Sequence, residues 1–208
     1  MTTQTKKLNI KIFADGAEKE KMLAAAKNPL VAGFTTNPTL MKKGGVTDYK
    51  KFALEILDAI KDKSLSFEVF ADEFDEMETQ AKEIASWGDN VYIKIPITNT
   101  KGESSLPLVK KLSDAGVKLN VTAIFTLKQV ENTVKALENS NGAYVSVFAG
   151  RIADAGIDPV PMMAEALEIL SVNPKLELLW ASVREVFNII QADQIGCHIV
   201  TVPDSLIK

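Results

Sequence analysis

Short β-branched runs alternate along this chain with longer segments of helical period, and this alternation limits the possible folds more than any other feature. The predicted strands are Leu8–Ala14, Leu30–Phe34, Leu65–Ala71, Asn90–Ile97, Val117–Ile124, Gly142–Phe148, Leu176–Ala181 and Cys197–Val202. The predicted helices are Glu18–Lys27, Tyr49–Lys61, Asp75–Ser86, Leu106–Ala115, Leu127–Glu138, Pro161–Leu170 and Glu185–Ala192. Strands separated by helices pair in parallel, because each helix returns the chain to the same edge of the sheet.

Two α/β architectures accommodate this order. In 208 residues, eight units have about 26 residues each, which suits a small (β/α)8 TIM barrel. A doubly wound open sheet is the alternative. The segment after the first strand, Phe13-Ala14-Asp15-Gly16-Ala17, has neither a Rossmann nor a Walker glycine pattern, which favours the barrel. Since no linker interrupts the alternation, we expect residues 1–208 to form one domain, with a short or truncated C-terminal helix beginning near Pro203.

Helix ends carry recognisable signals. Asp48 or Thr47 is placed to cap the helix that begins at Tyr49, and Thr126 to cap the helix that follows it directly, because short polar side chains accept hydrogen bonds from a helix's first amides. Gly116 and Gly196 each follow a predicted helix, where a left-handed residue is expected.

Composition excludes several classes of function. The net charge is only -3 and the basic residues are dispersed, so no nucleic-acid partner is expected. No apolar run reaches the roughly 18–20 residues that span a bilayer, and the polar Met1–Lys7 segment is unlike a secretory signal. A cytoplasmic protein without a membrane partner is therefore predicted.

Cysteine and histidine each occur once, as the neighbours Cys197 and His198. One cysteine cannot form an intrachain disulfide, and a catalytic zinc usually needs three ligands rich in His or Cys. We therefore predict neither a metal site nor a cofactor, and interpret both residues as strand packing.

Polar residues recur where the predicted strands end. They are Asp15, Asn37, Glu68, Lys94, Asn120 with Thr122, Ser146, and Ser182 with Arg184. The spacing is close to one such residue per βα unit. Reacting groups of TIM barrels lie at the carboxyl ends of the strands, so these side chains should surround one site.

Lys94 is the most informative of these residues, because it lies in the otherwise apolar strand Asn90–Ile97. A lysine there must be desolvated, paired or extended to water. Loss of solvent favours the neutral amine, which can attack a carbonyl. A strand-end lysine that simply reaches water is the alternative. Lys11 and Lys118 precede most of their apolar runs and are expected at the opposite end of the barrel.

Other residues have plain structural alternatives. Asp15 suits either a catalytic acid or a helix cap, and Thr35-Thr36-Asn37-Pro38-Thr39 suits a proline-stiffened turn. Asn120 and Thr122 are two positions apart and should face the same side of their strand. Arg151 and Arg184 suit phosphate binding or surface ion pairs, for instance Arg151 with Asp154.

Taken together, these segments resemble the transaldolase family, specifically its small single-barrel members, which include fructose-6-phosphate aldolase. The matching blocks are Phe13-Ala14-Asp15, Gly33-Phe34-Thr35-Thr36-Asn37-Pro38-Thr39, Phe67-Glu68-Val69, Ile93-Lys94-Ile95-Pro96-Ile97-Thr98, Asn120-Val121-Thr122, Ser146-Val147-Phe148-Ala149-Gly150-Arg151-Ile152 and Ala181-Ser182-Val183-Arg184. The resemblance covers nearly the whole chain and implies a class I aldolase-like barrel.

The resemblance implies a role for each matched residue. Lys94 would form the Schiff base, Asp15 would move the proton of the C4 hydroxyl during C3–C4 cleavage, and Glu68 with Thr122 would hold a proton-shuttling water. The dihydroxyacetone fragment would be bound by Asn37, Asn120 and Ser146. The substrate phosphate would be bound by Arg151, Ser182 and Arg184. Sugar phosphates are the implied partners, and a homo-oligomer is the implied assembly.

Two residues bear on the reaction. In this family, transaldolases carry glutamate and phenylalanine where the aldolase branch carries glutamine and tyrosine, and this chain has Glu68 and Phe148. We therefore expect a transaldolase that converts sedoheptulose 7-phosphate and glyceraldehyde 3-phosphate to erythrose 4-phosphate and fructose 6-phosphate. The alternatives are fructose-6-phosphate aldolase and a non-catalytic barrel that only binds sugar phosphate.

Overall fold

The computed structural model describes residues 7–207 and contains eight parallel strands in one closed barrel. The strands are β1 Lys11–Asp15, β2 Val31–Thr35, β3 Ser64–Glu68, β4 Val91–Pro96, β5 Leu119–Ile124, β6 Ala143–Val147, β7 Leu176–Trp180 and β8 Ile199–Pro203. Strand β1 pairs in parallel with both β2 and β8, which closes the sheet. The predicted (β/α)8 barrel is confirmed, and the open-sheet alternative is wrong.

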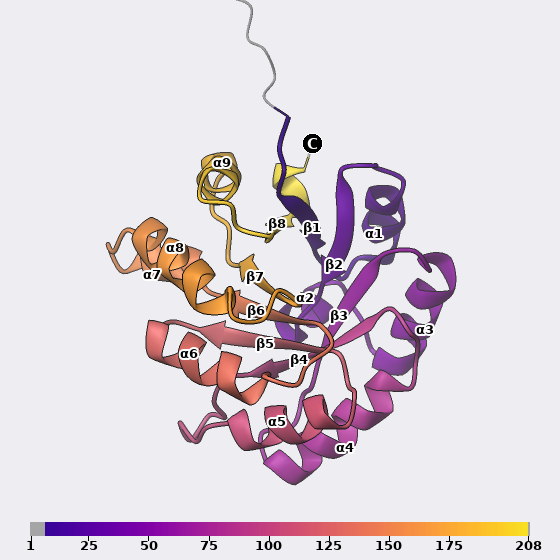
Figure 1. Ribbon diagram of the computed structural model, residues 1–208. Helices are drawn as coiled ribbons and strands as arrows, with labels where there is room; N and C mark the ends of the chain where they lie inside the picture. Colours follow the sequence, from indigo (N-terminus) through magenta and orange to yellow (C-terminus); the bar gives the residue numbers. More distant parts are fainter. Residues whose placement is uncertain (1–6, 208) are drawn as a thin grey trace, which may run out of the picture.

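The helices lie around the barrel, most of them on its outer side, and α2 is seen behind the strands near the middle of the view (Figure 1). They are α1 Lys19–Ala26, α2 Pro38–Lys43, α3 Tyr49–Ala59, α4 Phe74–Ala85, α5 Leu106–Asp114, α6 Leu127–Ala136, α7 Ala149–Asp154, α8 Pro159–Leu170 and α9 Val186–Gln194. After β8 the chain forms a single 3-10 turn, η1 Asp204–Leu206, which lies between α9 and α1 in Figure 1. Among residues 7–207, no helix has both the length and the apolar character needed to span a membrane.

Two helices were not predicted, α2 and α7. Each has six residues, which is too short to establish a helical period in the sequence. The start of α2 lies in the segment that was interpreted as a proline-stiffened turn. Pro38 occupies the first turn of α2 and the Asn37 side chain accepts a hydrogen bond from Leu40 N at 2.9 Å. Asn37 is therefore an N-cap, and the turn interpretation is corrected to a capped helix start.

The predicted helix ends are confirmed. Asp48 caps α3 by accepting from Lys51 N at 2.9 Å. Thr126 and Gln129 form a reciprocal capping box at α6. Gly116 and Gly196 both have left-handed backbones, with φ of +81° and +79°.

Inward-facing side chains form two successive layers inside the barrel. The lower layer is an aromatic and aliphatic cluster in which Tyr92 stacks on Tyr144 at 4.1 Å between ring centroids, and Phe13 meets Tyr144 edge-on. Residues two positions apart on a strand face the same side. Therefore Asp15, Lys94 and Ser146 lie directly above Phe13, Tyr92 and Tyr144, one layer closer to the carboxyl ends. The outward faces of the strands pack against the helices in a separate, larger core.

The single cysteine and histidine have the predicted packing roles. Cys197 is buried, and burial raises the pKa of its thiol to about 12. His198 is partly buried, and its Nδ1 accepts a hydrogen bond from Leu178 N at 2.9 Å, which joins the start of β8 to β7. At the same amino-terminal end, Lys11 pairs with Glu177 and Lys118 donates to the Asp89 carbonyl. Both lysines are thus at the end opposite Lys94, as predicted.

Helix α7 lies directly against the segment that follows β7, and Gly150 makes this approach possible. A Cβ atom at Gly150 would lie 1.6 Å from the Ser182 carbonyl oxygen. The backbone amide of Gly150 also donates to Ala181 O at 3.2 Å. No side chain fits this contact unless the backbone moves.

We predict that Gly150→Ala lowers the free energy of unfolding by about 3 kcal/mol, because the new methyl group collides with backbone rather than with a flexible side chain. Urea denaturation monitored by circular dichroism measures the change. Gly16→Ala is the matched control, because nothing lies within 4 Å of its added Cβ; it should alter stability by less than about 0.5 kcal/mol. Equal effects of the two variants would contradict the close approach.

Candidate functional site

A cavity of about 220 Å³ opens at the carboxyl ends of the strands, above the aromatic layer. Its lining includes ten of the eleven predicted site residues: Asp15, Asn37, Lys94, Asn120, Thr122, Ser146, Phe148, Arg151, Ser182 and Arg184. The eleventh, Glu68, contacts Lys94 directly. Residues that are distant in the sequence therefore surround one space, as their positions at the strand ends predicted.

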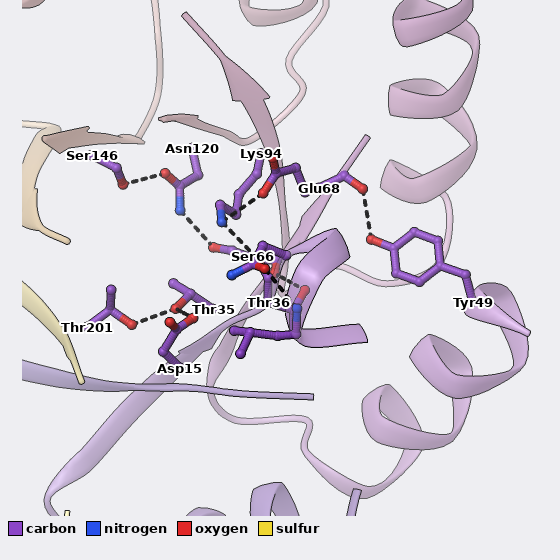
Figure 2. Close-up of polar contacts among 12 residues, drawn as sticks. Asp15, Thr35, Thr36, Tyr49, Ser66, Glu68, Lys94, Asn120, Ser146 and Thr201 are labelled. Atoms are coloured by element: carbon purple, nitrogen blue, oxygen red, sulfur yellow. Dashed lines mark hydrogen bonds and ion pairs between the residues drawn. The ribbon is translucent and has the colours of Figure 1, made fainter. Parts of the chain in front are cut away.

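Lys94 lies on β4 with only 7% of its surface exposed. Its Nζ lies 3.0 Å from Glu68 Oε2 and donates a hydrogen bond to the Thr36 carbonyl at 2.8 Å (Figure 2). The alternative of a lysine extended into water is therefore wrong. A buried charge is tolerated where it is paired and hydrogen-bonded, and the Glu68 carboxylate and the Thr36 carbonyl provide both interactions.

Strand register brings the partners of Lys94 together. Glu68 and Lys94 are direct neighbours across β3 and β4, and Lys94 and Asn120 are direct neighbours across β4 and β5. Asn120 is fully buried; its amide donates to Ser66 Oγ at 3.1 Å and its Oδ1 accepts from Ser146 Oγ at 2.6 Å. These contacts fix the orientation of the Asn120 amide beside the lysine.

Asp15 lies at the carboxyl end of β1, and its Oδ1 accepts a hydrogen bond from Thr35 Oγ1 at 2.8 Å. Burial raises the pKa of the Asp15 carboxyl, while Lys94 and the Thr35 hydroxyl oppose that shift. The residue at the N-cap of α1 is Glu18. The helix-cap interpretation of Asp15 is therefore wrong, and its carboxyl faces the cavity.

Thr122 lines the cavity and lies in a β-bulge. In the pairing of β5 with β6, the register shifts between Val121 and Ile124, so that two residues of β5 oppose one of β6. Ala123 in the bulge has φ of +58°, a conformation that costs energy for any residue with a Cβ. The shared orientation of Asn120 and Thr122 was predicted from their spacing; the bulge at Thr122 and Ala123 was not.

The segments after β6 and β7 provide the arginines: Arg151 lies in α7, and Arg184 lies between β7 and α9. Ser182 has a left-handed backbone with φ of +63°, which turns the chain sharply between β7 and Arg184. Arg184 Nε donates to Asp154 Oδ1 at 3.0 Å, and its Nη2 pairs with Asp154 Oδ2. Asp154 was suggested as a partner of Arg151, and this is corrected: its ion-pair partner is Arg184. Both arginines still line the cavity.

Phe148 lies on the same side of the cavity and meets the exposed ring of Phe125 edge-on, with ring centroids 5.5 Å apart. Phe125 follows β5, where it was not predicted to have a role. The two rings place an apolar surface beside the polar site.

Several supporting residues were missed by the sequence analysis. They are Thr35, Thr36, Tyr49, Ser66 and Thr201. The hydroxyl of Tyr49 donates to the Glu68 carbonyl at 3.0 Å, and burial raises its pKa. Ser66 and Thr201 each lie in a predicted strand that is otherwise largely apolar, and this was the available signal. Their partners come from other strands and could not be identified from the sequence.

A larger hollow of about 680 Å³ lies at the amino ends of the strands, around Ser64, Tyr92 and Lys118. None of the predicted site residues lines it, and its charged lining residues are Asp58, Lys61, Asp62, Lys63, Asp89 and Lys118. In the described part of the chain, no three His, Cys, Asp or Glu side chains are grouped so that they could hold a metal ion.

Fold and cavity together define a (β/α)8 barrel protein with a lysine paired to a carboxylate inside its carboxyl-end cavity. Solved structures share the fold. KGPDC from Streptococcus mutans superposes with a TM-score of 0.64 at 10% identity, over 96% of this chain and 89% of that chain. The 3-hexulose-6-phosphate synthase from Salmonella typhimurium gives 0.61 at 14% identity, over 94% and 90%.

Sequence comparison identifies the family. The transaldolase/fructose-6-phosphate aldolase model matches residues 12–208. A probable transaldolase of Dehalococcoides mccartyi is 36% identical over 93% of this chain and 87% of the relative. Another, of Streptococcus equi subsp. zooepidemicus, is 36% identical over 95% and 88%. The chain belongs to the transaldolase/fructose-6-phosphate aldolase family.

The raised pKa of Asp15 generates a prediction for stability. As the pH rises above the ordinary range of an aspartic acid, the folded protein must ionise a buried carboxyl that the unfolded chain ionises more readily. Asp15→Asn removes this requirement. The variant should therefore gain stability relative to wild type as the pH rises above that ordinary range, and urea denaturation at several pH values measures the difference.

Asp154→Asn is the control with the opposite sign. The hydrogen bond from Arg184 lowers the pKa of Asp154, so Asp154 favours the folded state only where it is ionised, and that contribution disappears as the pH falls. Asp154→Asn should therefore lose stability relative to wild type as the pH rises. A stability difference for Asp15→Asn that is flat or falls with pH would contradict the burial of that carboxyl.

Proposed function

We propose that this protein is a transaldolase, which transfers a dihydroxyacetone unit between sugar phosphates through a Schiff base on Lys94. The observation that carries the proposal is the position of Lys94, buried beside Glu68 in a cavity that Asp15 also lines. Family membership supports it, and so do the relatives described as probable transaldolases.

The first step is attack of the Lys94 amine on the C2 carbonyl of a ketose phosphate. The attacking nitrogen must be neutral; Glu68 Oε2, 3.0 Å away, would take its proton. Loss of water from the carbinolamine forms a protonated imine. Glu68 and Thr122, which lies at the cavity, would hold the water through which these protons move.

The second step is cleavage of the C3–C4 bond. Asp15 accepts the proton of the C4 hydroxyl as that oxygen becomes the carbonyl of the departing aldehyde phosphate. The electron pair of the broken bond passes into the imine and forms an enamine on Lys94. In the transfer, this enamine attacks the carbonyl carbon of the acceptor aldehyde phosphate, and the alkoxide that forms takes the proton back from Asp15. Hydrolysis of the resulting imine releases the new ketose phosphate and frees Lys94.

Polar groups around the cavity suit the parts of this substrate. Asn37, Asn120 and Ser146 would bind the hydroxyls of the dihydroxyacetone unit. Arg151, Ser182 and Arg184 would bind the phosphate, since guanidinium groups form paired hydrogen bonds with phosphate oxygens. Arg184 is held by Asp154, which orients its guanidinium and leaves Nη1 without a role in that ion pair.

Glu68 and Phe148 favour transfer over release. The Phe148 ring lines the cavity and packs against Phe125, so the side chain at this position offers no hydroxyl to hold a water near the enamine. An enamine that is slow to be protonated persists until an acceptor aldehyde arrives. We also propose a cytoplasmic location and a homo-oligomeric assembly.

The decisive assay follows glyceraldehyde 3-phosphate release from fructose 6-phosphate by a coupled dehydrogenase, with and without erythrose 4-phosphate. We expect release that requires the acceptor and rises with its concentration. Lys94→Met should lower the rate by about a thousandfold or more, as loss of a covalent nucleophile does. Lys118→Met is the matched control, because Lys118 lies at the opposite end of the barrel.

Three other outcomes of this assay would contradict the proposal. Sustained release without acceptor would make the protein a fructose-6-phosphate aldolase. Absence of release in both assays, from a folded protein that still binds fructose 6-phosphate, would favour the non-catalytic binder. Equal activity of wild type and Lys94→Met would remove Lys94 from the mechanism.

A further inference from the structure

Two buried threonines stand beside Asp15, and the chemistry above does not use them. Thr35 is at the carboxyl end of β2 and Thr201 is on β8, so they come from the two strands that flank β1. Their exposed fractions are 2% and 5%. Thr35 Oγ1 lies 2.8 Å from Asp15 Oδ1 and 2.5 Å from Thr201 Oγ1 (Figure 2).

The number of available hydrogens fixes which group donates in each of the two hydrogen bonds that link Thr201, Thr35 and Asp15. Each threonine hydroxyl has one hydrogen to donate, and an ionised carboxylate can only accept. Thr35 therefore donates its hydrogen to Asp15, and the oxygen of Thr35 must accept the hydrogen of Thr201. Two hydroxyls in sequence polarise each other, so Thr201 strengthens the hydrogen bond from Thr35 without contacting the carboxylate.

These two hydrogen bonds affect both the charge and the orientation of the Asp15 carboxyl. Burial raises the pKa of the carboxyl, and the hydrogen bond from Thr35 lowers it. The same bond occupies Oδ1, so that Oδ2 is the oxygen left to take a proton from a ligand. Without the hydroxyl of Thr201, the Thr35 hydroxyl would be a weaker donor and could turn away from Asp15.

We propose that Thr201 is a positioning residue for Asp15, which through Thr35 keeps the carboxylate ionised and oriented to accept a proton. The proposal rests on the proposed function, since the proton transfer by Asp15 belongs to that mechanism. It goes beyond the roles that the family resemblance assigns, because neither Thr35 nor Thr201 is among those residues.

Thr201→Val tests the proposal, because valine keeps the shape of threonine and removes the hydroxyl. We expect kcat to fall about five- to tenfold, the scale of one indirect hydrogen bond to a charged group. The acid side of the kcat profile should move to higher pH, because Asp15 loses stabilisation of its ionised form. The KM for fructose 6-phosphate should change less than about twofold. Thr201→Ser restores the hydroxyl and should restore both kcat and the profile.

If Thr201 had a purely structural role or contacted the ligand, the kcat, KM and pH profile of its variants would change in a different way. If Thr201 touched the substrate, KM would rise while the pH profile stayed in place. A fall in kcat without a shift of the acid limb, or no rescue by serine, would overturn the proposal. Thr201→Ala is a second variant with the same expected shift, in case valine packs poorly in the barrel.

A measurement of stability separates this proposal from the proposed function. The difference in unfolding free energy between wild type and Thr201→Val should grow as Asp15 ionises with rising pH, and the growth should vanish in the Asp15→Asn background. This pH-dependent coupling needs no catalysis, so it would survive even if the wild-type protein had no transaldolase activity. A coupling that is independent of pH would overturn the positioning role while leaving the proposed function intact.

Discussion

A lysine nitrogen inside a barrel is costly to bury, and much of the local structure serves to make that burial tolerable. Lys94 Nζ has a carboxylate oxygen at 3.0 Å and a carbonyl oxygen at 2.8 Å. Each partner is itself held: Tyr49 donates to the Glu68 carbonyl, and the Thr36 hydroxyl donates to Ser66 O. Removal of one partner of a buried ion pair typically costs about 3–5 kcal/mol, so the pair is also a constraint on the fold.

The barrel provides this environment through the two-residue period of its strands. Phe13, Tyr92 and Tyr144 fill the interior below the site, and the next inward residue of each strand faces the cavity. This buried layer fills the barrel beneath the site, and the cavity lies at the carboxyl ends of the strands. One periodicity thus produces both the desolvation of Lys94 and its access to a small ligand.

Much of this arrangement could be predicted from the sequence. The carboxyl ends of the strands in a parallel barrel meet at one edge, so the polar residues there could be assigned to one site from the sequence. The structure brings them together: ten of the predicted residues line the cavity, and Glu68 contacts Lys94. The part that could not be predicted depends on register and backbone conformation. The hydroxyl chain through Thr35 needs β8 beside β1, and the Arg184–Asp154 pair needs the left-handed turn at Ser182. The short helices α2 and α7 carry too few residues to show a period.

The central claim is that Lys94 bonds covalently to a ketose phosphate. The most direct test is incubation with fructose 6-phosphate followed by borohydride, which reduces an imine to a stable secondary amine, and then mass spectrometry of the digested protein. The account predicts one modified lysine, Lys94, and loss of the modification when borohydride or the sugar phosphate is omitted. An enzyme that turns over fructose 6-phosphate yet shows no adduct, or an adduct at another lysine, would contradict it.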